Sequence, residues 1–410
     1  MAEIEVPPYF LCPISLDIMK DPVTVSTGIT YDRDSIEEWI FSQRNNTCPV
    51  TKQLLVDPEL TPNITLRRLI QSWCTLHASH GVERLPTPKA PVSKPQLMKL
   101  LKDANSPQKQ IKCLETLKSM ASQNQTNKRC MEAAGAVEFL ASLVVKKALE
   151  ASRGEDSEFD LSDSRKACDE ALSVLYSLQL SESGLKALNN SEFIESLTLV
   201  MQSGSYDSRA YSVMLLKSML EVADPCLLIN LRPQFFAELA QILNDQISQK
   251  ASKATLKVLI IACPWGRNRI KAVESVPVLI DLLLDSYDKR ACEMMLTVLD
   301  LLCQCAEGRA ELLKHGAGLA IVSKKILRVS QAASERAVRI LHSVSRFSAT
   351  PRVLQEMLQI GIVAKLWLVV QVECGSKTKE RAREMLKVHA RAWRDSPCIP
   401  KNLISSYPSS

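Results

Sequence analysis

Three cysteines and two histidines are the side chains in the first 80 residues that could bind a metal ion. They are Cys12, Cys48, Cys74, His77 and His80. Structural zinc sites usually take cysteines in pairs separated by two to four residues, and no cysteine here has such a neighbour. Cys74, His77 and His80 have metal-like spacing, but they close an amphipathic helical pattern and lack a fourth ligand nearby. The sequence therefore predicts no metal ion and no cofactor.

A cysteine could alternatively carry a covalent intermediate. Such a nucleophile needs a neighbouring base or another group that lowers the pKa of its thiol. No cysteine–histidine pairing of that kind is visible in the sequence. Most of the 13 cysteines fall inside apolar helical patterns. We therefore expect reduced thiols that pack as small core residues.

The elements around these cysteines predict a small mixed domain over residues 5–80. Two short β-prone runs, Val23–Val25 and Ile29–Tyr31, flank a turn that contains Gly28. This arrangement is typical of a β-hairpin. The hairpin would lead directly into the first helix of the domain.

Two helices follow the predicted hairpin. Asp32 is a suitable N-cap for a helix over residues 33–43, and a second helix begins at Pro62-Asn63. Apolar side chains recur at helical spacing in both, as Ile36, Trp39 and Ile40 in the first and Leu66, Leu69, Ile70 and Trp73 in the second. A polar loop that carries residues 48–52 joins the two helices.

The rest of the chain is helical and repetitive. Residues 81–95 hold four prolines and predict a stiff, extended linker. From 96 to 395, turn residues recur at positions 135, 191, 233, 275, 316 and 361, and all but the first interval are close to the 42-residue period of armadillo or HEAT repeats. The longer first interval contains the acidic, Ser-rich stretch 148–163, which we interpret as a flexible insertion. Residues 396–410 predict a disordered tail.

Basic side chains concentrate in the last predicted helix, over residues 377–394. One side of this helix is expected to be apolar and carries Ala382, Leu386, His389 and Trp393. The cations on the other side fit the solvated face of a capping helix, and alternatively a site for an acidic partner.

Composition limits the classes of partner. The net charge of +6 is mild for 410 residues, and aromatic residues make up only 5%, so nucleic-acid binding is not favoured. The apolar runs are too short to span a membrane, and the acidic, proline-broken N-terminus is not a signal peptide. We therefore expect a cytosolic or nuclear protein with no integral membrane segment and no nucleic-acid partner.

Several strings in the first 80 residues match a known family in order and spacing. They are FLCPISLDIMKDPV at 10–23, GITYDR at 28–33, IEEW at 36–39, CPVT at 48–51 and LTPN at 60–63. These strings resemble the U-box of E3 ubiquitin ligases. With the helical repeats behind them, the chain is similar to plant U-box/armadillo ubiquitin ligases, and residues 66–74 look like the defence- and stress-associated branch.

The resemblance implies a mostly α fold class. A small α+β U-box, which is a zinc-free relative of the RING domain, would be followed by an armadillo/HEAT-type α-solenoid. The implied activity is that of an E3 ubiquitin ligase with no covalent ubiquitin–ligase intermediate. The U-box would recruit a ubiquitin-charged conjugating enzyme, and ubiquitin would pass directly to a lysine of a protein substrate held by the repeats.

The resemblance also assigns site residues. Ile14 and Leu16 match contacts of the first loop with the conjugating enzyme, Trp39 matches a contact of the central helix, and Pro49 a contact of the second loop. Cys12, beside the first loop, is included in the same surface. These side chains could instead belong to the domain core.

Lys52 matches the position of a basic linchpin, often arginine, that bridges ubiquitin and the conjugating enzyme. Such a residue performs no covalent chemistry but holds the thioester in an attack-ready pose. Lysine lacks the planar fork of arginine, so weaker activation is implied. Alternatively, Lys52 is a solvated surface lysine.

The whole protein could also be a non-catalytic armadillo scaffold or adaptor that uses its U-box only for docking or to form a homodimer.

Polar interactions must hold a U-box together where a RING domain uses zinc. Candidates for these interactions, which the sequence does not pair, are Asp17, Ser26, Arg33, Glu38 and Asn63. In the repeats, Asn127 and Asn268 are candidates to bind the backbone of a partner peptide. Both could instead cap helices or form turns.

Overall fold

The computed structural model describes residues 5–42, 45–55, 60–78, 92–153 and 158–393. The chain divides into two compact units, one running to Asp103 and including Thr116–Ala134, the other comprising Ala104–Glu115 and the chain from Gly135 onward. Among the described residues, no single helix has both the length and the apolar content to cross a membrane, although the bent pair Pro351–Gln359 and Ile362–Gln371 meets these criteria when taken together.

A three-stranded antiparallel sheet forms the centre of the N-terminal domain. Its strands are β1 (Pro22–Thr24), β2 (Thr30–Asp32) and β3 (Thr61–Pro62), in the order β2-β1-β3. Val23 pairs with Tyr31. Gly28, with φ +81°, makes the turn that joins β1 to β2, a backbone conformation that glycine adopts without strain. The predicted hairpin is therefore confirmed.

Three helical segments surround this sheet: η1 (Pro8–Phe10), α1 (Arg33–Glu37) with the π-helical η2 (Glu38–Ser42), and α2 (Ile64–Leu76). The helix predicted over residues 33–43 begins as expected but changes to π-helical geometry at Glu38. In α2, Ile70 and Cys74 are buried, whereas Leu69 is 53% exposed. Our assignment of Leu69 to the buried face is wrong, because the helix packs on the side that also carries Cys74.

The core of this domain combines residues from every element. Its fully or largely buried members include Phe10, Cys12, Met19, Val23, Val25, Tyr31, Ile36, Cys48, Leu55, Ile70 and Cys74. Ile14 and Trp39 are only partly buried and pack against this cluster from outside.

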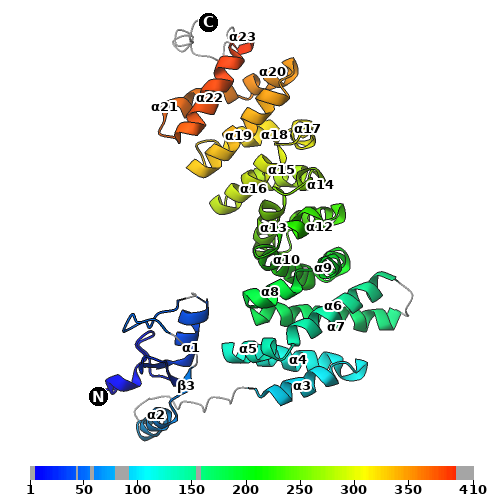
Figure 1. The fold of residues 1–410 in the computed structure, drawn as a ribbon. Helices are drawn as coiled ribbons and strands as arrows, with labels where there is room; N and C mark the ends of the chain where they lie inside the picture. The colour runs from blue at the N-terminus through cyan, green and yellow to red at the C-terminus, as the bar shows by residue number, and fades with distance from the viewer. Residues whose placement is uncertain (1–4, 43–44, 56–59, 79–91, 154–157, 394–410) are drawn as a thin grey trace. The chain divides into compact units, whose positions relative to one another are not determined.

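Helices make up the remainder of the described chain (Figure 1). Their bounds are α3 (Lys94–Asp103), α4 (Pro107–Gln123), α5 (Gln125–Ala133), α6 (Ala136–Arg153), α7 (Glu158–Leu178), α8 (Glu182–Leu188), α9 (Ser191–Ser203), α10 (Tyr206–Leu220), α11 (Pro225–Ile229), α12 (Pro233–Asp245), α13 (Gln249–Ala262), α14 (Asn268–Lys271), α15 (Ser275–Asp285), α16 (Lys289–Leu302), α17 (Ala306–Lys314), α18 (Gly318–Lys325), α19 (Gln331–Phe347), α20 (Pro351–Gln359), α21 (Ile362–Gln371), α22 (Ser376–Val388) and α23 (Ala390–Trp393).

The helices repeat in groups of three, such as α10–α12, α13–α15 and α16–α18. Every predicted turn position lies at the start of the third helix of a group, at or within two residues of the first residue of α6, α9, α12, α15, α18 or α21. Helices α10, α13, α16, α19 and α22 contact one another in succession, and Figure 1 shows α13, α16, α19 and α22 following one another along one side. The predicted armadillo-type repeat is confirmed, since each group shares its core with the next.

Residues 148–163 differ from our expectation of a flexible insertion. Ala148–Arg153 continues α6, and Glu158–Asp163 begins α7. The additional residues therefore lengthen two helices that contact each other. Residues 154–157, residues 79–91 of the predicted linker and the predicted tail lie outside the described residues. Pro95, placed in the linker by sequence, is already in α3.

Asn127 and Asn268 serve the fold and are not available to a peptide. Both are almost fully buried. Asn127 Nδ2 donates to the carbonyl of Met120 at 3.1 Å. Asn268 Nδ2 donates to the carbonyls of Leu228 at 2.7 Å and Ala262 at 3.0 Å. These bonds satisfy carbonyls at helix ends, so the capping interpretation replaces the peptide-binding one.

The C-terminal helix is broken where the sequence predicted one continuous segment. α22 ends at Val388, and α23 begins at Ala390. The side chain of His389, at the break, is hydrogen-bonded through Nε2 to the carbonyl of Ser345 at 2.9 Å. Trp393 is fully buried, as its apolar position predicted.

Candidate functional site

The first predicted contact loop, Leu11–Ile18, is closed at its ends by a β-bridge. Inside it, the N–H of Cys12 donates to the carbonyl of Asp17, and the N–H of Leu16 donates to the carbonyl of Cys12, both at 2.8 Å. Leu16 adopts a left-handed backbone with φ +62°. The loop is therefore a tight hydrogen-bonded turn that holds Leu16 in one orientation.

The second loop, Thr47–Leu54, repeats this geometry. A β-bridge closes its ends, and the N–H of Cys48 donates to the carbonyl of Gln53 at 2.8 Å. The N–H of Lys52 donates to the carbonyl of Cys48 at 2.9 Å, and Lys52 is left-handed with φ +59°. Lys52 thus occupies in the second loop the position that Leu16 occupies in the first.

The same duplication is present in the sequence. Residues 12–17 read Cys-Pro-Ile-Ser-Leu-Asp, and residues 48–53 read Cys-Pro-Val-Thr-Lys-Gln. The cysteine, the proline, the β-branched residue and the hydroxyl residue recur at the same places. Aligning the strings places Val50 opposite Ile14, and Val50 is 51% exposed. Val50 is therefore a contact candidate that sequence reasoning missed.

Both loops are anchored at neighbouring residues at the end of β2. The N–H of Asp32 donates to Cys12 Sγ at 3.3 Å. The hydroxyl of Tyr31 is hydrogen-bonded to Cys48 Sγ at 3.0 Å and accepts the N–H of Val50 at 3.3 Å. Since Tyr31 and Asp32 are adjacent and lead into α1, the two loops lie at the same end of the domain, beside α1.

The two cysteines therefore organise the loops through hydrogen bonds. Burial by itself raises the pKa of the Cys48 thiol, but hydrogen bonds involving Thr27, Thr51 and Tyr31 outweigh burial and lower the pKa to about 6. Burial raises the pKa of Tyr31, and its bond with Cys48 adds to that effect. Tyr31 consequently acts as the donor to a negatively charged Cys48 sulfur near neutral pH.

Replacing Tyr31 with phenylalanine is expected to destabilise the second loop by about 1–2 kcal/mol at pH 8, because Cys48 loses a donor to its thiolate. The lowered pKa of Cys48 adds stability that is complete above pH 9.0, its ordinary value, and is lost as the pH falls through about 6. The deficit of Tyr31→Phe should accordingly be greater at pH 8 than at pH 5.5. Hydrogen exchange in peptides that cover residues 45–55, corrected for the intrinsic exchange rate at each pH, measures this loss of stability.

Tyr9→Phe is the matched control, since Tyr9 lies in the same domain with its ring exposed. It should leave exchange in residues 45–55 unchanged at both pH values. An equal deficit for Tyr31→Phe at pH 5.5 and pH 8 would contradict the thiolate assignment.

Ion pairs and partly buried carboxylates hold the domain where a RING domain has zinc. Arg33 Nε binds Asp21 Oδ2 at 2.6 Å, and Arg67 lies 3.6 Å from the other oxygen of Asp21. Asp32 Oδ1 accepts the N–H groups of Lys20 and Asp21 at 2.8 Å each. These bonds lower the pKa of Asp32, but burial outweighs them and the net shift is upward.

The polar candidates named from sequence divide into two sets. Arg33 makes the ion pair with Asp21, and Asn63 caps α2 by accepting the N–H of Leu66 at 3.0 Å. Asp17, Ser26 and Glu38 are exposed, so they are not buried substitutes for metal ligands. Sequence reasoning missed the polar contacts of Asp21, Asp32 and Arg67. Their partners are distant in the sequence and come together only when the chain folds. Within the described residues, no three Cys, His, Asp or Glu side chains are grouped so as to hold a metal ion.

The predicted apolar contacts differ in their exposure. Leu16 is 72% exposed, whereas Ile14, Trp39 and Pro49 are half-buried. Cys12 is 0% exposed and bonded to Asp32, so its inclusion in the contact surface is wrong. A partner could touch the other four but could not reach Cys12.

Lys52 is exposed and lies near Trp39. Its Nζ is 5.8 Å from the centre of the Trp39 ring, within range of a cation–π contact. Trp39 is fixed by its Nε1, which donates to the carbonyl of Thr47 at 2.8 Å. The cation thus sits beside the half-buried indole, so one small surface offers an apolar contact and a positive charge.

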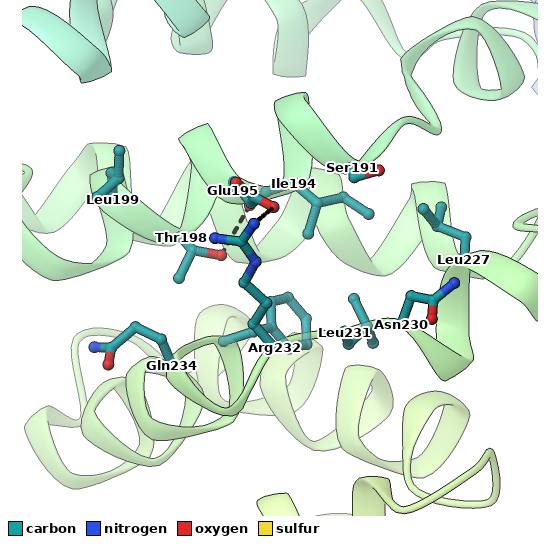
Figure 2. A pocket seen from close by; sticks show the side chains of 11 residues that line it. Ser191, Ile194, Glu195, Thr198, Leu199, Leu227, Asn230, Leu231, Arg232 and Gln234 are labelled. Carbon is teal, nitrogen blue, oxygen red and sulfur yellow. Dashed lines mark hydrogen bonds and ion pairs between the residues drawn. The ribbon is translucent and has the colours of Figure 1, made fainter.

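A separate apolar pocket lies in the repeat array between α9 and α12 (Figure 2). Its volume is about 230 Å³, and Ile194, Leu231 and Phe235 contribute to its wall. Arg232 reaches across the pocket to Glu195, with a nitrogen–oxygen distance of 2.9 Å. The pocket is large enough for one apolar side chain of a partner, since engineered cavities of about 150 Å³ already hold benzene.

Comparison with known proteins identifies the family. A model described as the U-box domain matches residues 6–79, and one described as the plant U-box protein ARM repeat region matches residues 96–409. The chain belongs to the plant U-box protein family. It is 59% identical to E3 ubiquitin-protein ligase PUB23 of Arabidopsis thaliana, across 99% of this chain and 98% of that protein. It is 57% identical to PUB22 of the same plant, across 99% of each.

Membership of the plant U-box family makes the chain an E3 ubiquitin ligase with a U-box and armadillo repeats. A ubiquitin-conjugating enzyme, ubiquitin and a substrate are the partners that this activity requires. The duplicated loops, and the surface that carries Leu16 and Lys52, belong to the U-box. The pocket belongs to the repeat region.

Proposed function

We propose that the two U-box loops and the start of η2 form the docking surface for a ubiquitin-charged conjugating enzyme. Leu16 carries this proposal, because it exposes an apolar side chain from a left-handed backbone that leucine rarely adopts. Both features are unfavourable for an isolated domain. Ile14, Trp39 and Pro49, all half-buried, extend the apolar surface around it.

Lys52 supplies the activating contact in this proposal. It is held in the same turn geometry as Leu16, so its side chain leaves the domain beside the docked enzyme. There, its ammonium group would bind both the conjugating enzyme and the ubiquitin that this enzyme carries. Restricting the mobile ubiquitin to one pose favours attack by a substrate lysine on the thioester. Ubiquitin then passes directly to that lysine.

Trp39→Ala is expected to weaken binding of the conjugating enzyme by about tenfold, because a half-buried aromatic side chain at an interface is a frequent hot spot. The change also removes the bond to Thr47, so Trp39→Phe serves as the control, because it loses that bond but keeps an aromatic ring. Calorimetry with a conjugating enzyme that carries no ubiquitin measures the affinity of each variant. It distinguishes a contact with the conjugating enzyme from a role in supporting the core. Unchanged affinity in Trp39→Ala would mean that this side chain only supports the core.

The repeat array holds the substrate in this proposal, and the pocket between α9 and α12 would accept one of its apolar side chains. The similarity of residues 66–74 to the defence- and stress-associated branch supports a role in plant defence or stress signalling. In this proposal the protein works in the cytosol or the nucleus.

Self-ubiquitination of the purified full chain tests the proposed function. The reaction contains ubiquitin, ATP, an activating enzyme and, in separate samples, several conjugating enzymes. We expect ubiquitin chains with at least one conjugating enzyme, and their loss when Leu16 is replaced by asparagine. A chain that is folded by circular dichroism yet inactive with every conjugating enzyme would instead support the scaffold interpretation.

A further inference from the structure

Most of the protein's net charge is concentrated in two neighbouring helices. α19 and α22 together carry eight cationic and three anionic side chains, a net charge of +5, while the whole chain has +6. The two helices pack side by side in the row that also contains α16. This end of the array therefore presents a positive field.

A buried carboxylate organises part of this charge. Asp300 of α16 is only 3% exposed. Its Oδ2 accepts Arg336 Nη1 at 3.0 Å and Arg339 Nε at 3.1 Å, both from α19. The two arginine side chains are themselves about one-third exposed. Each therefore reaches inward to Asp300 with one nitrogen and keeps further N–H groups toward the surface.

Arg381 of α22 adds a third guanidinium to the same region. Its charge acts on Asp300, and its Nη1 is buried without a hydrogen-bond partner. The nearest ion-pair partner, Glu335, lies 4.0 Å from that nitrogen. One carboxylate cannot satisfy three guanidinium groups, because each has five N–H donors. The cluster therefore has more donors than acceptors.

The ion pairs with Asp300 have a structural role, but the exposed cations of the same helices do not. The bonds to Asp300 join α16 to α19 and stabilise the stacking of two repeats. They do not explain the cations that the helices also expose, since a single aspartate and arginine would join the same helices. Arg346, for example, is 60% exposed and lies 3.8 Å from Glu384 of α22. The exposed N–H groups of Arg336, Arg339 and Arg346 are therefore available to an acid from outside the chain.

We propose that the basic face formed by Arg336, Arg339, Arg346 and Arg381 binds an acidic segment of a partner protein. Carboxylates of that segment accept the guanidinium N–H groups that Asp300 leaves unused, in the paired geometry that arginine favours. The acidic segment would bind even if the chain had no ligase activity, whereas the partner's fate as a substrate rests on the proposed function.

A protein partner fits this face better than a nucleic acid. Glu335 and Glu384 stand between the arginines, and Glu384 is bonded to His342 at 2.9 Å. A uniform row of phosphates would be repelled at these two positions. A polypeptide can place its acidic residues opposite the arginines and neutral or basic residues opposite the glutamates.

The test uses the full chain and three fluorescein-labelled 15-residue peptides that alternate serine with glutamate, glutamine or lysine. We expect binding of the glutamate peptide alone, and its affinity should fall as the salt concentration rises. Arg381→Gln should weaken that affinity by about tenfold, or about 1.4 kcal/mol, because it removes a charge-assisted hydrogen bond to the peptide.

Arg383→Gln is the matched control. It makes the same change two residues along α22, on a different side of the helix, where the side chain is exposed. Arg346→Glu is a second variant, chosen because its exposed side chain leaves the Asp300 bonds in place. Its effect should equal or exceed that of Arg381→Gln, and both variants should keep the melting temperature and the ubiquitin discharge rate of the wild type.

Three results would overturn the proposal. The first is equal loss of affinity in Arg381→Gln and Arg383→Gln, which would indicate general charge attraction. The second is tighter binding of a labelled 15-nucleotide RNA than of the glutamate peptide at the same salt concentration. The third is no binding of the glutamate peptide at low salt by a chain that still discharges ubiquitin, which would leave the ligase function intact while rejecting the site.

Discussion

Lys52→Glu is expected to slow ubiquitin transfer by about 10- to 100-fold while affinity for the uncharged conjugating enzyme changes by less than about threefold. The reason is that Lys52 positions the attached ubiquitin and contributes little to docking. Misplacing reacting groups by even 1 Å can cost about 100-fold in rate. Single-turnover discharge of ubiquitin from the conjugating enzyme to free lysine measures the first quantity, and calorimetry measures the second.

Two further variants separate charge from backbone geometry at Lys52. Its φ of +59° is tolerated by asparagine better than by most residues, so Lys52→Asn removes the charge while preserving the turn. Lys52→Asn should transfer ubiquitin more slowly than the wild type but faster than Lys52→Glu. Lys52→Arg should equal or exceed the wild type, because a planar fork can bridge two proteins. Parallel losses of affinity and transfer rate in Lys52→Asn would reject the positioning role.

Leu16→Asn is expected to weaken binding of the conjugating enzyme by about 30-fold or more while leaving the U-box as stable as the wild type or more stable. A central apolar contact contributes about 2 kcal/mol or more at an interface. In the free protein, however, Leu16 is 72% exposed and has a φ of +62°, a conformation that costs most residues about 1–2 kcal/mol. Asparagine relieves that strain and removes the exposed apolar surface.

The opposite signs of these two effects make the prediction specific. Calorimetry gives the affinity, and hydrogen exchange across residues 10–24 gives the local stability. Leu69→Asn is the control, because Leu69 is also an exposed leucine of this domain but lies on α2. It should leave the affinity unchanged. A Leu16→Asn variant that binds normally, or one that loses affinity only because the loop unfolds, would refute the docking role.

Local patterns in the sequence predicted the elements of the fold well. The hairpin follows from two β-prone runs around Gly28, and the array follows from a turn that recurs about every 42 residues. Both signals depend on residues close together in the chain. Leu69 shows the limit of such reasoning, because periodicity identifies an apolar stripe but not which edge of the stripe the domain covers.

The paired contacts of the U-box could not be predicted in the same way. Asp21 meets Arg33 and Arg67, and the Asp32 carboxylate accepts backbone N–H groups from the segment before β1. These pairings exist only after the sheet has formed. The types of residues 16 and 52 can be read from the sequence, but nothing in it indicates that both backbones are left-handed. That shared geometry is what presents one apolar and one basic side chain from equivalent turns.

Discharge of ubiquitin from a charged conjugating enzyme, followed in a single turnover with the full chain present, tests the central claim most directly. We expect wild type to accelerate transfer to free lysine, Leu16→Asn and Lys52→Asn to accelerate it much less, and no thiol-sensitive ubiquitin adduct to form on the chain. A ubiquitin thioester on any of its 13 cysteines, or full acceleration by both variants, would contradict it.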